Sequence, residues 1–169
     1  MAAIAYVGLG SNLGRREEAV LRAVRELETG RAVRVTRLSS LYETEPVGIV
    51  GARRFVNAVA EVESLLPPGD LLERLKAIET GMGRTGGHQQ SREIDLDLVS
   101  FGEELVASEA LVLPHPRFHQ RHFVLVPLRE IAPGFVCPRT GRGLADMLAR
   151  LPGDGGVERV SGRTLLARG

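Results

Sequence analysis

The feature that most constrains the fold is a strict alternation of side chains in two segments. In residues 55–63, small or branched apolar residues fill every second position, and Phe55 and Asn57 fall on the opposite face. A second segment reads IDLDL, so Asp95 and Asp97 share one face and apolar residues occupy the other. Successive side chains of a β-strand point to opposite faces of a sheet. Both segments are therefore predicted to be strands with one buried face and one face free for chemistry.

The order of the elements predicts a fold class. Strand and helix patterns alternate as strand, helix, strand, strand, helix, strand, which is the split βαβ or ferredoxin-like arrangement. We therefore predict an α+β fold with a mostly antiparallel sheet, helices on one face and the ligand site on the other. The predicted elements are residues 3–9, 15–28, 33–42 and 55–63, a helix that opens at Pro67 and buries Leu71, Leu72, Leu75, Ile78 and Met82, the strand of Asp95, and helical stretches at 121–130 and 144–151.

Length and composition bound the organisation. A chain of 169 residues with 43% hydrophobic content is expected to bury a core without disulfides or metals. We predict a single domain over residues 1–169, in which residues 152–169 form a peripheral C-terminal tail.

Charge and cysteine content exclude several classes of function. The net charge of +1 and the 4% aromatic content do not favour a nucleic-acid partner. The N-terminal residues contain neither a basic leader nor a long apolar run, so no membrane partner is expected. Cys137 is the single cysteine, which suits a reducing compartment. We predict a cytoplasmic protein that acts on small molecules, and nothing implies an oligomer.

The two aspartates at 95 and 97 are candidate metal ligands. A pair of carboxylates about 6–7 Å apart along a strand suits hard divalent cations, and a pair of such ions is the usual clamp for phosphoryl transfer. A strand with one solvated face would show the same alternation. The metal interpretation is favoured because residue types that grip phosphate stand nearby, namely Arg92, His115, Arg117 and Arg121.

One glycine-rich segment lies between the first predicted strand and helix, where dinucleotide-binding proteins carry their phosphate-binding motif. Gly8, Gly10 and Gly14 have the spacing GxGxxxG rather than GxGxxG, and the next predicted strand does not end in an acidic residue. A tight turn is the better interpretation.

The segments 43–54 and 84–91 lack periodicity and are predicted to be loops that border the sheet. They are either loops that close over a substrate or ordinary surface loops.

Six ordered motifs carry a resemblance to a known family. VGLGSNLG, LYETEPVG, FVNAV, REIDLDL, LPHPRFHQRHFVLVPL and EIAP follow one another over about residues 4–140. In this order they resemble the 6-hydroxymethyl-7,8-dihydropterin pyrophosphokinases of folate biosynthesis. The resemblance implies transfer of diphosphate from ATP to the pterin hydroxymethyl group, with release of AMP.

The resemblance also implies roles for individual residues. Asp95 and Asp97 match the aspartates that hold two Mg²⁺ ions, and with Arg84 and Arg92 they form the expected catalytic set. The implied ATP contacts are Lys76, Glu79, Arg84, Arg92, Leu98, His115 and Arg121. The implied pterin contacts are Thr44, Pro46, Val47, Phe55, Asn57 and Phe123.

Two other hypotheses remain at this point. One is a metal-dependent enzyme of another phosphate chemistry on a similar sheet, against which the pair Phe55 and Asn57 argues. The other is a non-catalytic ferredoxin-like binding module, which has no need of two aspartates beside several arginines. Lone phenylalanines such as Phe55 and Phe123 are also more often core residues than ligand contacts.

Overall fold

Two long central strands organise the sheet. A computed structural model describes residues 1–45, 53–83 and 93–160. In it, β1 (Ala3–Ser11) pairs antiparallel with β4 (Phe55–Ser64) along all of β1. The other edge of β1 pairs with β5 (Asp95–Phe101), and the sheet order is β5-β1-β4-β3-β8 with β2 also paired to β4. Every strand pair of this sheet is antiparallel.

The topology confirms the ferredoxin-like prediction. Strand β1 and strand β2 (Val33–Leu38) are both antiparallel to β4, so they run parallel to each other with β4 inserted between them. Helix α1 (Arg16–Glu28) connects them. In the same way β4 and β5 flank β1 and are connected by α2 (Pro68–Gly81). The two split βαβ units thus interlock through the two central strands.

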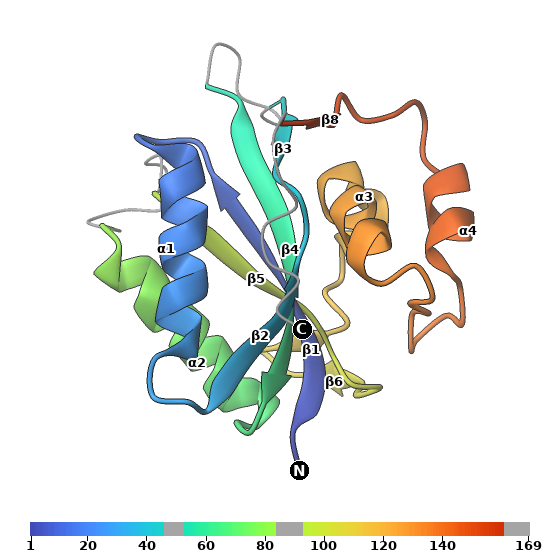
Figure 1. Ribbon diagram of the computed structural model, residues 1–169. Helices are drawn as coiled ribbons and strands as arrows, with labels where there is room; N and C mark the ends of the chain where they lie inside the picture. The colour runs from blue at the N-terminus through green and yellow to red at the C-terminus, as the bar shows by residue number, and fades with distance from the viewer. Residues whose placement is uncertain (46–52, 84–92, 161–169) are drawn as a thin grey trace.

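Helices α1 and α2 cover one face of the sheet (Figure 1). Each presents a stripe of apolar residues at helical spacing, which on α1 comprises Ala19, Val20, Ala23, Val24 and Leu27. These side chains form one core cluster with the alternate apolar positions of β1, β4 and β5. The inward set predicted for β4 is correct, since Val56, Ala58, Ala60 and Val62 are each at most 1% exposed.

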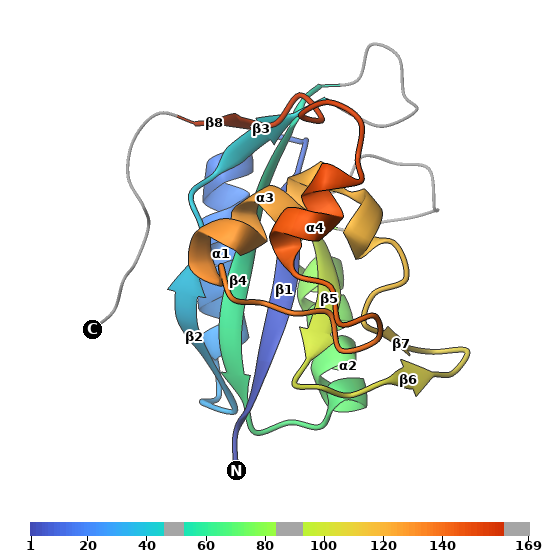
Figure 2. The same ribbon diagram turned by 90° about the vertical axis from the view of Figure 1, so that its right-hand side faces the viewer.

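The opposite face is not left open along its whole length. Helices α3 (His122–Ile131) and α4 (Leu144–Ala149) lie over part of it (Figures 1 and 2). Their apolar residues form a second core cluster with Val59 and Val99 of the sheet. The expectation of helices on one face only is therefore corrected. Helix α3 has its own apolar stripe, and burying that stripe requires a sheet surface that the first pair of helices does not occupy.

One predicted strand is divided in two. The segment 33–42 becomes β2 and β3 (Tyr42–Thr44), and both pair with the same edge of β4. Between β2 and β3, Ser39 pairs with Val59 of β4, and the Ser39 hydroxyl takes the place of a main-chain acceptor. Its amide donates to the Val59 oxygen at 2.9 Å, and its Oγ accepts from the Val59 amide at 2.9 Å. The backbone groups of β4 stay satisfied while the neighbouring strand bends.

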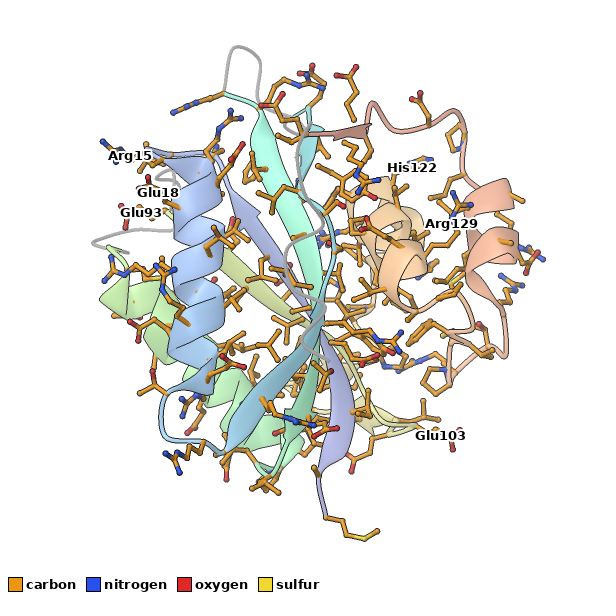
Figure 3. All side chains as sticks on the ribbon, in the orientation of Figure 1. Arg15, Glu18, Glu93, Glu103, His122 and Arg129 are labelled. Atoms are coloured by element: carbon orange, nitrogen blue, oxygen red, sulfur yellow. The ribbon has the colours of Figure 1, made fainter. Side chains whose placement is uncertain are left out.

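The segment after α4 contributes to the sheet. Strand β8 (Glu158–Arg159) pairs antiparallel with β3, so these two residues form an edge strand of the sheet. His122, at the start of α3, contacts the segment that leads to β8, with its Nε2 at 3.2 Å from the Gly153 oxygen (Figure 3). The remaining short elements are β6 (Val106–Ala107), β7 (Val112–Leu113) and a 3-10 turn, η1 (Phe118–Gln120). No helix in the described ranges has the length and apolar character needed to span a membrane.

Candidate active site

A cleft of about 500 Å³ opens on the part of the sheet that α3 and α4 leave uncovered. It is lined by β1, β3, β4 and β5, by one side of α2, and by the start of α3. Most site residues expected from the sequence meet here although they are far apart along the chain. They are Thr44, Phe55, Asn57, Lys76, Glu79, Asp95, Asp97, His115, Arg121 and Phe123.

The floor of the cleft is backbone. Gly8 and Gly10 lie inside β1, so the prediction that they form a tight turn is wrong; the turn contains Gly14, with φ of +63°. Gly10 stands in register between Asn57 and Asp95. A Cβ at Gly10 would lie 2.7 Å from Asn57 Oδ1, closer than real contacts allow. Glycine is needed at this position because a side chain would displace the amide of Asn57.

Asp95 and Asp97 project into the cleft from β5, opposite Gly10 and Gly8. The Asp97 side chain is about half exposed at 48%, and its Oδ2 lies 3.6 Å from Arg121 Nη1. Carboxylate oxygens beside an open floor suit a hard divalent cation. No group of three or more potential ligand side chains occurs in the described ranges. Water and ligand oxygens would therefore have to complete the coordination, as is usual for Mg²⁺.

Helix α2 presents a second stripe to the cleft. Leu72, Lys76 and Glu79 are spaced by four and three residues and all line the cavity, so Leu72 is not the inward core residue predicted from the sequence. Glu79 is 7% exposed, and its Oε2 accepts the Leu96 amide at 3.0 Å. Because β5 is an edge strand, this bond satisfies a main-chain donor that has no strand partner on that side. Glu79 thereby fixes the strand residue that stands between the two aspartates.

His115 is held in one orientation. Its amide donates to the Val99 oxygen at 2.8 Å, and its Nδ1 accepts the Arg117 amide at 3.1 Å. In the neutral ring Nε2 then carries the hydrogen and is free to donate. Burial lowers the pKa of His115 below its usual value, and the charges of Arg121 and Arg117 lower it further, although Asp97 opposes them. The ring is therefore a neutral hydrogen-bond donor at neutral pH.

The other end of the cleft combines aromatic rings with an amide. Phe55 and Phe123 both line the cavity and are only partly buried, so neither is a simple core residue. The Arg121 guanidinium carbon lies 5.5 Å from the Phe123 ring centroid. Asn57 is buried at 6% exposure and donates through Nδ2 to Thr44 Oγ1 at 2.6 Å. That bond fixes the amide and leaves its Oδ1 over the glycine floor.

Ion pairs stabilise the end of the sheet that carries Phe55. Arg54, next to Phe55, lies 3.5 Å from Glu43, 3.3 Å from Glu45 and 3.5 Å from Glu158 of β8. Glu43 is also 2.8 Å from Arg16 of α1. Glu45 itself lines the cleft, so Arg54 offsets the charge of a carboxylate close to the ligand space.

Some expected residues lie elsewhere. Leu98 is 3% exposed within the α1–α2 core and its side chain does not line the cleft, whereas Leu96 of the same strand does. Arg84, Arg92, Pro46 and Val47 fall outside the described residues. Sequence reasoning did not name Leu72 or Leu96 as site residues, and it named Glu45 only within the main chain of residues 44–47. For Leu72 a signal existed, since it precedes Lys76 by one helical turn.

Comparison with known proteins places the chain in a family. Residues 6–133 match the family described as 7,8-dihydro-6-hydroxymethylpterin-pyrophosphokinase. The chain belongs to this family. It is 45% identical over 129 residues to the 2-amino-4-hydroxy-6-hydroxymethyldihydropteridine pyrophosphokinase of Bacillus subtilis, covering 76% of this chain and 77% of that protein. The Pseudomonas aeruginosa protein of the same name is 40% identical over 158 residues, covering 93% of this chain and 96% of that one.

Solved structures agree on the fold. The Plasmodium falciparum HPPK-DHPS wild type with pteroate aligns with a TM-score of 0.70 at 15% identity, covering 88% of this chain and 42% of that chain. At this identity the likeness shows the fold alone. The chain spans less than half of that longer protein.

Proposed function

We propose that the cleft catalyses the reaction of the family, the transfer of diphosphate from ATP to the hydroxymethyl group of 6-hydroxymethyl-7,8-dihydropterin in folate biosynthesis. The observation that carries the proposal is the juxtaposition of two different half-sites on one glycine floor. The Asn57–Thr44 pair lies at one side of Gly10, and Asp95 lies at the other. One half suits a flat polar heterocycle, and the other suits the charge of a triphosphate.

The pterin half is assigned to Phe55, Asn57, Thr44 and Phe123, with Pro46 and Val47 as further contacts outside the described residues. A pterin is planar and carries donors and acceptors along one edge, so it needs aromatic faces and a fixed amide. The bond from Asn57 to Thr44 supports this assignment, because it orders the amide before the ligand arrives.

The ATP half is assigned to Lys76, Glu79, His115 and Arg121, together with Arg84 and Arg92 from outside the described residues. The neutral His115 ring offers Nε2–H to a phosphate oxygen. Arg121 and Lys76 add positive charge on two sides of the cleft. Leu98 would contact the nucleotide only through its main chain, because its side chain is buried in the core.

Asp95 and Asp97 are assigned as the ligands of Mg²⁺, with two ions per site. Mg²⁺ held by these carboxylates would reduce the negative charge that a nucleophile must approach. Glu79 accepts the amide of Leu96, the residue between the two aspartates, and Arg121 contacts the Asp97 carboxylate directly. Both contacts help to position the two carboxylates.

The chemistry follows from positioning. The pterin hydroxyl oxygen forms a bond to the β-phosphorus and its proton passes to solvent, while the bond from that phosphorus to the α-phosphate oxygen breaks and AMP leaves with the electron pair. In such transfers the protein contributes alignment and charge stabilisation rather than covalent catalysis. We also infer a cytoplasmic enzyme of single-domain architecture with small-molecule partners, and the net charge of +1 does not favour a nucleic-acid partner.

The direct test is product identification. The protein is mixed with ATP, Mg²⁺ and the hydroxymethyl dihydropterin, quenched within one turnover, and separated by chromatography. We expect AMP and a pterin diphosphate in equal amounts. Accumulation of ADP with a pterin monophosphate would contradict the proposal, and so would release of inorganic phosphate without a modified pterin.

A further inference from the structure

A second cavity of about 400 Å³ adjoins the cleft but is separate from it. Its walls come from the segment 114–120, from the turn 137–142 and from the end of α4. Among the described residues, only His115 lines both this cavity and the catalytic cleft. The family reaction as assigned above uses none of the other residues around it.

The floor of this second cavity is apolar. Phe118, Cys137 and Met147 are 2%, 4% and 3% exposed, and all three line it. Small-molecule sites have this character, with a mostly apolar surface of similar volume and a few polar groups that set orientation. A floor of this kind favours a ligand with a ring or a short hydrocarbon body.

The rim is cationic. Arg139, Arg142 and Arg150 line the cavity, and no Asp or Glu appears among its described lining residues. Asp146 contacts two of these arginines from outside the lining, at 3.8 Å from Arg142 and 3.4 Å from Arg150. Three guanidinium groups against one carboxylate leave an excess positive charge at the mouth. An anionic group on the ligand would balance it.

The rim is also held in shape. The Cys137 amide donates to the Arg142 oxygen at 2.9 Å, and the Gly141 amide donates to the Cys137 oxygen at 2.8 Å. Gly141 has φ of +73°, which only glycine adopts readily. Arg139 Nη2 donates to the Leu113 oxygen at 3.0 Å, which ties the turn to the end of β7. The arginines are therefore presented by an ordered backbone.

We propose that this cavity is a second ligand site, which binds a small organic anion with an apolar body and a carboxylate or phosphate group. The body packs on Phe118 and Met147, and the anionic group lies at Arg142 and Arg150. Because His115 forms a wall of both cavities, occupancy of the second site alters ATP binding in the first. This link, unlike the binding itself, rests on the proposed function.

The first test measures binding of a defined probe. Naphthoate supplies two rings and a carboxylate, and naphthamide has the same shape without the charge. Titration calorimetry on the full chain is expected to show one naphthoate site, with naphthamide at least about fivefold weaker. The double variant Arg142→Gln, Arg150→Gln should lose that preference, whereas Arg34→Gln, whose side chain is 70% exposed on β2, should keep it. Equal affinity for both probes, or no binding of either, overturns the proposal.

The second test locates the probe. Cys137 is the only cysteine of the chain and lies on the floor of this cavity alone. Its thiolate attacks one sulfur of dithiobis-nitrobenzoate, the disulfide bond of the reagent breaks, and a coloured nitrobenzoate thiolate leaves. Saturating naphthoate is expected to slow this reaction at least about threefold. A thiol that reacts equally fast with and without the probe contradicts the site.

The third test addresses the link to ATP. Saturating naphthoate should change the Kd of Mg-ATP at least about twofold, and ATP should change the naphthoate Kd by the same factor, because coupling is reciprocal. An unchanged Kd refutes the link. The proposed function fails differently, since loss of diphosphate transfer would leave naphthoate binding and Cys137 protection intact.

Discussion

At the residue scale, Asp97 and Arg121 illustrate how the cleft balances its charge. They lie 3.6 Å apart in a site built for a polyanion and its cations. Asp97 is 48% exposed, Arg121 is 26% exposed and the contact is long, so the pair contributes little to the stability of the fold. We expect Arg121 to stay beside Asp97 when ligands bind, so that the carboxylate would hold the metal while the guanidinium contacts phosphate.

Replacement of Asp97 tests the metal role. We expect Asp97→Asn to lower turnover about a hundredfold or more, because a full charge is lost where the transferred phosphate is stabilised. The matched control is Glu103→Gln, in the turn beyond the far end of β5 (Figure 3). Steady-state rates across a Mg²⁺ titration give the answer. Near-normal turnover of the aspartate variant would exclude Asp97 as a ligand.

The Asn57–Thr44 bond tests the pterin half. Thr44 is 3% exposed, and Thr44→Val keeps its shape while removing the acceptor of the Asn57 amide. We expect weaker pterin binding by about 1–2 kcal/mol with ATP binding unchanged. Thr44→Ser, which keeps the hydroxyl, should restore most of the affinity. Calorimetry that finds equal losses for both ligands would indicate a general packing defect instead.

His115 gives a pH dependence with a defined sign. Its pKa is lowered in the folded protein, mainly by burial, so the unfolded chain binds more protons at mildly acidic pH. The free energy of unfolding should therefore fall as the pH drops from neutral to below about 6.5. His115→Gln should reduce that fall, and His119→Gln, on an exposed position, should not. Urea unfolding at several pH values measures both, and identical profiles for the two variants would contradict the assignment.

At the element scale, Glu130 joins α3 to the break between β2 and β3. Its carboxylate accepts the Ser40 amide at 2.9 Å, the Ser40 hydroxyl at 2.7 Å and the Tyr42 hydroxyl. Burial raises the pKa of Tyr42 to about 12, and its bond to Glu130 acts in the same direction. Burial would raise the pKa of Glu130, but the hydrogen bonds from Tyr42 and Ser40 outweigh it and lower it. Helix α3 thus fixes the strand that carries Thr44.

We expect Glu130→Ala to destabilise the fold by about 1–2 kcal/mol, because the Ser40 amide loses its partner in a buried position. The lowered pKa of Glu130 means that this contribution is present at neutral pH and is lost as the pH falls below about 4.5. Glu73→Ala, on the exposed side of α2, serves as the control. Unfolding curves that coincide for the parent protein and the Glu130 variant would contradict the role.

Local patterns predicted some features of the elements and not others. Alternation correctly placed Phe55, Asn57, Asp95 and Asp97 on one face, because strand geometry has a period of two. The break after Leu38 was not predictable, since it depends on Ser39 bonding to Val59 across the sheet. The same holds for the cover provided by α3, because an apolar stripe shows that a helix is buried but not on which face.

At the scale of the whole molecule, the cleft depends on residues from both split βαβ units. Gly10 comes from the first, Glu79 and Asp97 come from the second, and Arg121 immediately precedes α3. The ordered motifs of the sequence predicted this assembly through resemblance to a family. Spacing alone predicted only the neighbours along each strand, since contacts between distant segments are set by the topology.

Because the site spans the fold, ligand binding should stabilise the whole chain. Mg-ATP at about one hundred times its Kd should add about 2.7 kcal/mol to the free energy of unfolding. We expect a higher Tm with Mg-ATP, a smaller shift with ATP and a chelator, and almost none for Asp97→Asn with Mg-ATP. Equal shifts with and without the chelator would show that the metal does not contribute to nucleotide binding.

The glycine floor also limits the substitutions by which the protein could avoid an inhibitor bound in this cleft. A compound resting on Gly8 and Gly10 touches main chain, which point mutation cannot remove. The available mutations add atoms, and at Gly10 the first added carbon would meet Asn57 Oδ1 at 2.7 Å. A substitution at Gly10 that expels such a compound would therefore also disturb Asn57, the group assigned to the natural substrate, whereas an added carbon at Gly8 would meet no atom closer than 3.8 Å. Escape by substitution at Gly10 would therefore be expected to weaken pterin binding as well, which makes the main chain at Gly10 a better anchor for inhibitor design than the surrounding side chains.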